Sequence, residues 1–229
     1  MNFPTLNYEK KLFSQGYNFI AGVDEAGRGA WAGPLVAATV IMPRGKIIEG
    51  VRDSKLISPE NREILCEKIK ETAVSWAVGI INIDFINKYN IGRANVKAFE
   101  LAIENLDIKP DYVMIDGVLK LKMADGRHNG RDALQCVSTA GINCGGAIVE
   151  YESIKDGDAK IYSIAAASII AKVTRDEILK KEHLKFPEYG FDKHKGYGTK
   201  FHQDALRKHG ICEIHRVLYK PIKKLALFQ

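Results

Sequence analysis

The segment that decides the fold is residues 17–42, YNFIAGVDEAGRGAWAGPLVAATVIM. It holds two apolar, β-branched runs, 17–23 and 34–42, separated by the glycine-rich turn DEAGRGAWAG. Apolar runs bounded by turn residues are typical of β-strands, so the segment predicts a hairpin-like pair of strands. The first strand ends on two adjacent acids, Asp24 and Glu25.

Outward from this pair, helix-like and strand-like segments alternate along the chain. The helices are expected over residues 58–73, 90–106, 163–186 and 199–209, and the further strands over 74–83 and 109–117. Their predicted boundaries are N-caps at Ser58, Asn90 and Ser163 and a stop at Gly210. This alternation predicts a three-layer α/β fold, in which helices cover both faces of a sheet.

Residues 120–147 do not fit the alternation. Glycines and mixed polar residues leave this stretch with neither a 3.6-residue nor a 2.0-residue period. We therefore expect an irregular insertion, either a surface hairpin or a neutral loop extension. The extension is favoured because long surface insertions cost little free energy.

The composition is that of a globular protein with one domain-sized core. The chain has 229 residues, 46% of them hydrophobic, and holds no apolar run of the roughly eighteen residues needed to cross a bilayer. Its N-terminus lacks the apolar core of a signal peptide. The four cysteines have no metal-ligand spacing, so we expect reduced thiols and a cytoplasmic protein.

Positive charge is concentrated in the C-terminal quarter. Residues 172–229 hold 14 Lys and Arg against 7 Asp and Glu, whereas residues 1–171 hold 20 against 21. Such a skew suits a partner made of phosphates, because neutralised phosphates release condensed counterions. A solvated lysine-rich surface explains the same counts, and both interpretations stay open.

Acids directly follow apolar strands at two places, as Asp24 and Glu25 in IAGVDEAG and as Asp116 in YVMIDG. A half-buried carboxylate is costly unless it is paired or binds a cation. Either segment alone could be an ordinary Asp-Gly turn. Together they indicate a cluster of acids that requires a metal.

A fourth acid, Asp176, lies on the helix expected over 163–186, on the same face as Ser168 and Lys172. The alternative here is a surface ion pair between Lys172 and Asp176. Four carboxylates would form an all-oxygen site suited to Mg²⁺ or Mn²⁺. Two such ions can activate a water and stabilise the leaving oxygen of a phosphodiester, so no protein nucleophile is required.

Two further segments could contact a nucleic acid. The turn Gly27, Arg28, Gly29 offers unobstructed backbone N–H groups and a guanidinium beside the acids, although a plain tight turn has the same sequence. Tyr197 lies in a glycine-flanked turn among Lys and His residues, where it could stack on a base or sugar. A tyrosine packed under its own loop is the competing interpretation.

Five motifs in this order resemble ribonuclease HII. They are AGVDEAGRG, DSK at 53–55, IDG at 115–117, SIAAASIIAKVTRD ending at Asp176, and KHKGYGT followed by HQDAL. The resemblance implies a ribonuclease H-like fold, with a central mixed sheet flanked by helices. It also implies a catalytic domain over 1–180 and a small helical region over 181–229 that helps to grip a duplex.

The resemblance implies a metal-dependent nuclease of RNA/DNA hybrids that also incises duplex DNA on the 5′ side of embedded ribonucleotides, leaving 3′-hydroxyl and 5′-phosphate ends. It assigns the catalytic metal ligands as Asp24, Glu25, Asp116 and Asp176. It places Gly27, Arg28 and Gly29 around the ribonucleotide 2′-hydroxyl and Tyr197 at the sugar of the RNA-to-DNA junction. Lys55, Ser168 and Lys172 would be further substrate or active-site contacts.

Two features separate this sequence from related patterns. The Asp at 176 and the start of the chain about twenty residues before the first motif favour ribonuclease HII over ribonuclease HIII, which carries an extra N-terminal domain and a Glu as its fourth acid. The turn GRGAWAGP replaces the common GRGPLAGP, which changes its stiffness but keeps Arg28 and its flanking glycines.

Two other functions are compatible with parts of the sequence. A non-catalytic hybrid-binding module would use the basic tail and Tyr197, and a junction resolvase would use the acids without the GRG turn. The C-terminal KKLALFQ, with Leu225, Leu227 and Phe228, resembles peptides that bind the sliding clamp, or else forms a terminal helix packed by its apolar face. We expect a monomer.

Overall fold

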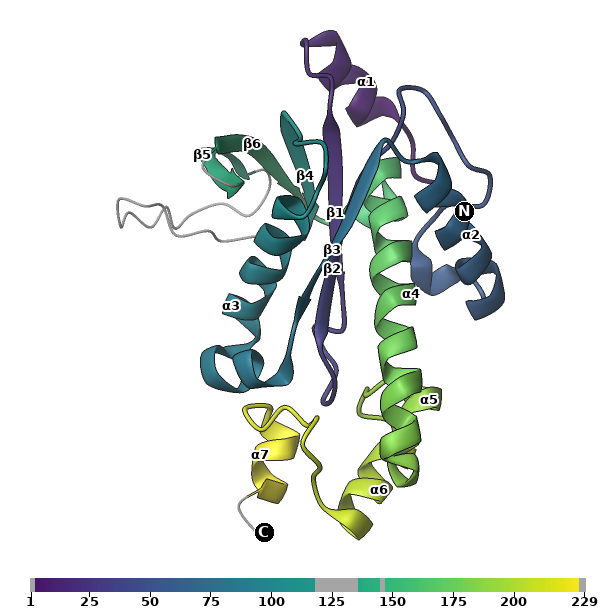
Figure 1. Cartoon of the computed structure of the whole chain (residues 1–229), viewed down its shortest axis with the longest axis vertical. Helices are drawn as coiled ribbons and strands as arrows, with labels where there is room; N and C mark the ends of the chain where they lie inside the picture. Colours follow the sequence, from purple (N-terminus) through teal and green to yellow (C-terminus); the bar gives the residue numbers. More distant parts are fainter. Residues whose placement is uncertain (1–2, 118–135, 145–146, 227–229) are drawn as a thin grey trace.

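The computed structural model describes residues 3–117, 136–144 and 147–226. Within them six strands form one mixed sheet in the order β3-β2-β1-β4-β6-β5 (Figure 1). The strands are β1 Ile20–Ala26, β2 Leu35–Ile41, β3 Ser75–Ile81, β4 Tyr112–Asp116, β5 Cys136–Cys144 and β6 Ala147–Ile154. The helices are α1 Asn7–Ser14, α2 Pro59–Thr72, α3 Ile83–Glu104, α4 Tyr162–Lys185, α5 Phe191–His194, α6 Lys200–His209 and α7 Lys220–Ala226.

The predicted hairpin is confirmed, because β1 and β2 pair antiparallel from Ala21↔Ile41 to Ala26↔Val36. On its other edge β1 pairs parallel with β4, and Val23 lies opposite Ile115. Parallel strands end at the same edge of a sheet. The acids that follow Val23 and Ile115 therefore lie side by side.

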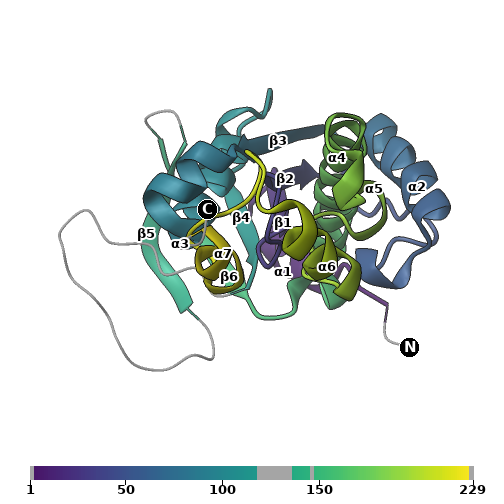
Figure 2. The same cartoon turned by 90° about the horizontal axis from the view of Figure 1, so that it is seen from below.

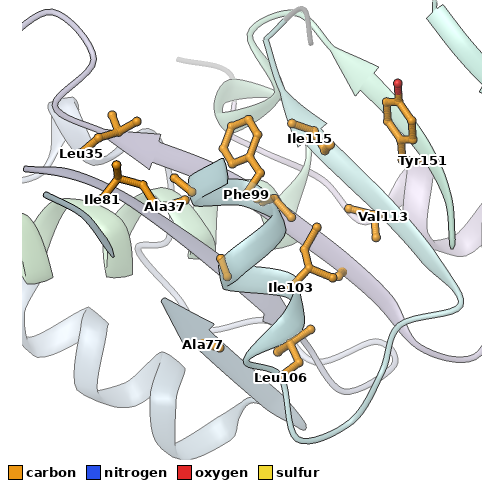
Figure 3. Packing of buried hydrophobic residues seen from close by; sticks show 14 of the residues in the cluster. Leu35, Ala37, Ala77, Ile81, Phe99, Ile103, Leu106, Val113, Ile115 and Tyr151 are labelled. Atoms are coloured by element: carbon orange, nitrogen blue, oxygen red, sulfur yellow. The ribbon is translucent and has the colours of Figure 1, made fainter. Parts of the chain in front are cut away.

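Helices cover both faces of the sheet, which confirms the three-layer α/β prediction (Figure 2). On one face Phe99 and Ile103 of α3 pack on a cluster that includes Ala37 and Ile115 (Figure 3). On the other face α4 packs on β1 and β2, and α2 packs beside α4. The approach of α4 is close at Gly22, where a Cβ would lie 2.2 Å from the backbone of Ser163.

The predicted N-cap at Ser163 is wrong. Helix α4 already begins at Tyr162, and Ile161 at its N-cap offers no side-chain hydrogen bond. Instead, Glu9 of α1 accepts hydrogen bonds from the Ser163 N–H (3.0 Å) and hydroxyl (2.9 Å). A carboxylate from a distant helix thus satisfies a donor at the positive end of α4, a role that no local pattern predicts.

The prediction of an irregular insertion over 120–147 is also wrong in part. Cys136–Cys144 forms the edge strand β5, which pairs antiparallel with β6. The register shifts between Ser138 and Ile142, and this irregularity interrupts the alternation expected of a strand. Residues 118–135 lie outside the described residues.

The predicted cap at Asn90 is correct, although its helix begins earlier. Helix α3 starts at Ile83, and Asn90 interrupts it with a φ of 72°. The Asn90 side chain accepts hydrogen bonds from the N–H groups of Gly92 (2.9 Å) and Arg93 (3.2 Å). It therefore caps the second half of α3.

The C-terminal region is helical, as expected, and packs on the C-terminal half of α4. Its buried cluster joins Ala32 and Leu179 to residues of α6 and the segment before α7. The predicted division at residue 180 falls inside α4, so this helix belongs to both parts. No described helix is long and apolar enough to span a membrane.

Candidate active site

Three aspartates meet at the end of the sheet where β1 and β4 terminate. Asp24, Asp116 and Asp158 each offer a carboxylate oxygen, and these oxygens lie within 4.8 Å of one another. Asp24 belongs to β1 and Asp116 ends β4. Asp158 belongs to the 3-10 turn Gly157–Ala159, which follows β6, the next strand of the sheet.

Backbone donors hold two of these carboxylates in place. The Gly157 N–H donates to Asp116 Oδ1 at 2.6 Å, and the Glu25 N–H donates to Asp24 Oδ1 at 2.7 Å. Gly157 also lies close to its neighbours, because a Cβ there would be 2.7 Å from Ile164 Cδ1 and 3.2 Å from Asp116 Oδ1. The turn that carries Asp158 is therefore anchored directly to Asp116.

The acids are crowded, and each is buried or half-buried. Burial raises the pKa of Asp24 well above its usual range, and the charges of Glu25 and Asp116 raise it further. Burial and then the charge of Asp158 raise the pKa of Asp116. Burial raises the pKa of Glu25 to about 7, against the opposing effect of Arg28. A bound cation would relieve this repulsion, and an all-oxygen donor set fits Mg²⁺ or Mn²⁺.

The DSK motif lies against the same acids. Lys55 Nζ is 3.2 Å from Asp158 and 3.8 Å from Asp53. The Ser54 hydroxyl is 2.8 Å from that of Ser168, whose side chain also hydrogen-bonds to Asp24. The structure thus brings the predicted residues Lys55 and Ser168 to the aspartates.

The GRG turn borders the site and is open on one side. Nothing lies within 4 Å of a Cβ built on Gly29, whereas one on Gly27 would lie 1.9 Å from Arg175 Nε. Arg28 is largely exposed, and its guanidinium is 3.7 Å from Glu25. Open space beside the Gly29 backbone and the Arg28 guanidinium thus lie next to the acids.

The family model for ribonuclease HII matches residues 21–222. The chain belongs to the ribonuclease HII family. It is therefore a metal-dependent ribonuclease H that acts on RNA/DNA hybrids, as the sequence motifs predict.

Relatives of this family are similar over nearly the whole chain. The ribonuclease HII of Caldicellulosiruptor bescii is 44% identical over 211 residues, covering 92% of this chain and 91% of that protein. That of Acetivibrio thermocellus is 47% identical over 212 residues, covering 93% and 73%. The crystal structure of ribonuclease H2 from Pyrococcus horikoshii OT3 has a TM-score of 0.70 at 25% identity, covering 92% of this chain and 98% of that one. The ribonuclease H-like fold is confirmed.

Asp176, the predicted fourth acid, is not brought into the aspartate group. It lies eight residues beyond Ser168 on α4, which is about 12 Å along a helix. Its carboxylate is 2.6 Å from Lys172 Nζ and 3.6 Å from Arg62. The ion pair considered as the alternative is therefore present, though largely buried, and metal binding by Asp176 stays a prediction.

Arg62 connects this ion pair to the DSK motif. Its guanidinium donates to the carbonyls of Ser54 (2.8 Å) and Ile57 (2.7 Å). Asp176 is thus connected to the active site indirectly, because Arg62 pairs with it and also holds the loop that carries Lys55. Lys172 lies on this side of the site, with Nζ 6.0 Å from the centre of the Tyr197 ring.

Tyr197 is partly exposed, with 38% of its surface accessible, so it is not packed under its own loop. The Arg175 guanidinium lies 5.5 Å from its ring centre. The flanking glycines are needed for packing, because a Cβ at Gly198 would lie 2.2 Å from Trp31. Trp31, which departs from the usual family turn, thus supports the Tyr197 turn.

Three residues in or behind this site escaped the sequence-based prediction. Arg175 and Arg216 are fully buried and donate to carbonyls of the turn after β1, including those of Ala32 and Gly33. Nothing in their local sequence distinguishes them from surface arginines. Asp158 could have been found, because it follows an apolar segment as Asp24 and Asp116 do, but β6 was not predicted.

Proposed function

We propose that this enzyme hydrolyses the RNA strand of RNA/DNA hybrids at a two-metal site. We further propose that it incises duplex DNA on the 5′ side of embedded ribonucleotides, leaving 3′-hydroxyl and 5′-phosphate ends. The observation that carries the proposal is the group of three aspartates, two buried and one half-buried, with carboxylate oxygens within 4.8 Å of one another, beside Glu25 and the open GRG turn.

The proposed metal ligands are Asp24, Glu25, Asp116 and Asp158. When bound, Mg²⁺ or Mn²⁺ would lower the pKa of a water and stabilise the leaving oxygen of the phosphodiester. The raised pKa of the three acids that precede Asp158 in the chain is what a site for divalent cations is expected to have without its metal. Ser168 holds Asp24, and Lys55 is close enough to Asp158 to share the site with a substrate phosphate.

Selection of ribose is proposed to reside in the GRG turn and Tyr197. The 2′-hydroxyl is the group by which a protein distinguishes RNA from DNA. The open side of Gly29 and the exposed guanidinium of Arg28 offer donors to the sugar and its phosphate. Tyr197, with Lys172 and Arg175 beside its ring, could pack on the neighbouring sugar.

The test is a DNA duplex that contains one ribonucleotide, incubated with Mg²⁺ or Mn²⁺. We expect a single incision 5′ to that nucleotide, which Asp116→Asn abolishes, and no cleavage of an all-DNA duplex. Cleavage of a continuous hybrid alone would contradict the ribonucleotide-incision part. Cleavage of branched DNA alone would indicate a resolvase.

We also propose a cytoplasmic, monomeric enzyme that serves ribonucleotide removal and primer removal. Clamp binding by the C-terminal peptide is a further proposal, since Leu227 and Phe228 lie outside the described residues and Leu225 lies in the last turn of α7. Removal of the last five residues should abolish clamp capture in a pull-down. Unchanged capture would contradict it.

A further inference from the structure

Three buried histidines lie behind the Tyr197 turn, away from the aspartates. His194, His202 and His215 are all at most 9% exposed. The rings of His194 and His202 are stacked with centres 4.5 Å apart, and His202 Nε2 is 3.0 Å from His215 Nε2. None of these residues has a part in the proposed metal chemistry.

The hydrogen-bond partners fix where the protons are. The Cys212 backbone N–H donates to His215 Nδ1 at 2.9 Å, so this nitrogen carries no proton, although the Cys212 carbonyl is also 3.2 Å away. A neutral His215 then bears its proton on Nε2 and donates it to His202 Nε2. His202 in turn bears its proton on Nδ1, which donates to the Tyr197 carbonyl at 3.0 Å.

His194 fixes the same turn at a second point. The Gly196 N–H donates to His194 Nδ1 at 3.2 Å, and His194 Nε2 donates to the Tyr189 carbonyl at 2.7 Å. The Tyr197 carbonyl also accepts from the Thr199 N–H at 2.8 Å. The backbone on both sides of the exposed Tyr197 ring is thus held by neutral imidazoles.

We propose that His202 and His215 are positioning residues that hold the Tyr197 turn and thereby set the discrimination between a single ribonucleotide and a continuous hybrid. We call the chain from the Cys212 N–H through His215 and His202 to the Tyr197 carbonyl the histidine relay. The functional part of the proposal rests on the proposed role of Tyr197. The relay itself rests on distances and donor chemistry alone.

The surroundings keep the relay neutral. Burial lowers the pKa of His202 and of His215 to about 4, which removes the charged form at neutral pH. The titratable groups that face the two rings are His194 of α5, Cys212, and Tyr189 of the turn before α5. A proton added to His202 Nε2 would place two donors face to face.

The first experiment measures protonation in the full-length protein by ¹⁵N NMR of its histidines at neutral pH. We expect His202 as the Nδ1–H form and His215 as the Nε2–H form. An Nε2–H form or an imidazolium at His202 would overturn the relay. This result is independent of whether the enzyme cuts single ribonucleotides.

The second experiment compares two substitutions of His202. His202→Leu removes both hydrogen bonds, whereas the His202→Asn amide can still donate to the Tyr197 carbonyl. We expect His202→Leu to lower the ratio of kcat/KM on a one-ribonucleotide duplex to that on a continuous hybrid by about five- to tenfold, the effect of about one hydrogen bond. His202→Asn should restore most of the ratio, and His202→Leu should lower it no further in a Tyr197→Ala background.

A merely structural role for His202 would lower both activities together and leave the ratio unchanged, which would overturn the proposal. If His202→Leu fails to fold, His215→Asn replaces it, because its Oδ1 can still accept from the Cys212 N–H while the bond to His202 is lost. An unchanged ratio of kcat/KM values in that variant would also overturn the proposal. If the wild type does not incise single ribonucleotides, the proposed function fails while the NMR result still decides on the relay.

Discussion

Asp158 and Asp176 have different surroundings, and these surroundings imply different roles. Asp158 shares its space with two other carboxylates and with Lys55. Asp176 is neutralised by Lys172 and Arg62. A cation would therefore lower the free energy of the Asp158 cluster, whereas Asp176 already has its counter-charges.

The two aspartates are predicted to respond differently to removal of their charge. Asp158→Asn should abolish cleavage and the stabilisation by Mn²⁺, which is about 2.7 kcal/mol for the wild type at ~100 times Kd. Asp176→Asn should keep the Mn²⁺ response but destabilise the fold by about 1–3 kcal/mol, because Lys172 and Arg62 lose their partner. Thermal unfolding with and without Mn²⁺ measures both, and loss of the Mn²⁺ response in Asp176→Asn would restore it as a ligand.

The crowded acids also predict how pH affects the metal-free protein. Because folding raises the pKa of Glu25 from 4.5 to about 7, the folded state holds a proton that the unfolded state releases. The contribution of this bound proton to the free energy of unfolding is fully present below pH 4.5 and is lost as pH rises through about 7. Glu25→Gln should therefore gain stability relative to wild type across this window, as measured by urea unfolding with a chelator present. A constant difference between the two proteins would show that Glu25 titrates normally.

At the residue scale, sequence patterns located Asp24 and Asp116 because each ends an apolar strand that could be recognised. Asp158 was missed because β6, the strand before it, was not predicted, although Val149 and Tyr151 alternate there with Glu150 and Glu152. Asp176 was assigned by its motif. Its helical face is correct, but the eight-residue spacing from Ser168, about 12 Å along α4, already places Asp176 away from the residues beside Asp24.

At the scale of elements, several ends set by local hydrogen bonds were predicted, but the start of α3, where Asn82 accepts from the Phe85 N–H, was not. Ser58 accepts from the Asn61 N–H at 3.3 Å, Thr199 accepts from the His202 N–H at 3.3 Å, and α6 ends at Gly210. The start of α4 was predicted to within one residue but its cap was not, because the capping carboxylate is 154 positions away in the chain. Helix α1, which supplies that carboxylate, was not predicted either.

This long-range cap can be tested by comparing its two partners. Glu9→Ala should destabilise the protein by about 1–2 kcal/mol, since it removes the acceptor of both the Ser163 N–H and hydroxyl bonds. Ser163→Ala removes the hydroxyl bond alone and should cost less. Urea unfolding measures both variants, and a larger loss in Ser163→Ala would contradict a capping role for Glu9.

At the scale of the whole molecule, buried guanidinium groups join the sheet to the C-terminal region. Arg175 of α4 donates to the carbonyls of Pro34 and Lys195, and Arg216 donates to those of Gly27 and Pro34. The GRG turn and the Tyr197 turn are therefore fixed to one scaffold. Their relative position is a property of the tertiary structure that sequence motifs do not contain.

These buried hydrogen bonds predict that Arg216→Lys is not a conservative change. A lysine ammonium cannot reproduce the planar fork that reaches the carbonyls of Gly27, Gly33 and Pro34. We expect a loss of about 3 kcal/mol or more, because buried carbonyls are left without donors. Activity on hybrids and on single ribonucleotides should fall together. Wild-type stability in this variant would contradict the claim that the Arg216 hydrogen bonds hold the sheet and the C-terminal region together.

The central claim is that Asp24, Asp116 and Asp158 together hold the catalytic metal. The most direct measurement is a crystal structure with Mn²⁺, located by its anomalous scattering. The account predicts a Mn²⁺ ion within about 2.0–2.3 Å of oxygens of these three aspartates. A Mn²⁺ ion bound at Asp176, or none near Asp158, would contradict it.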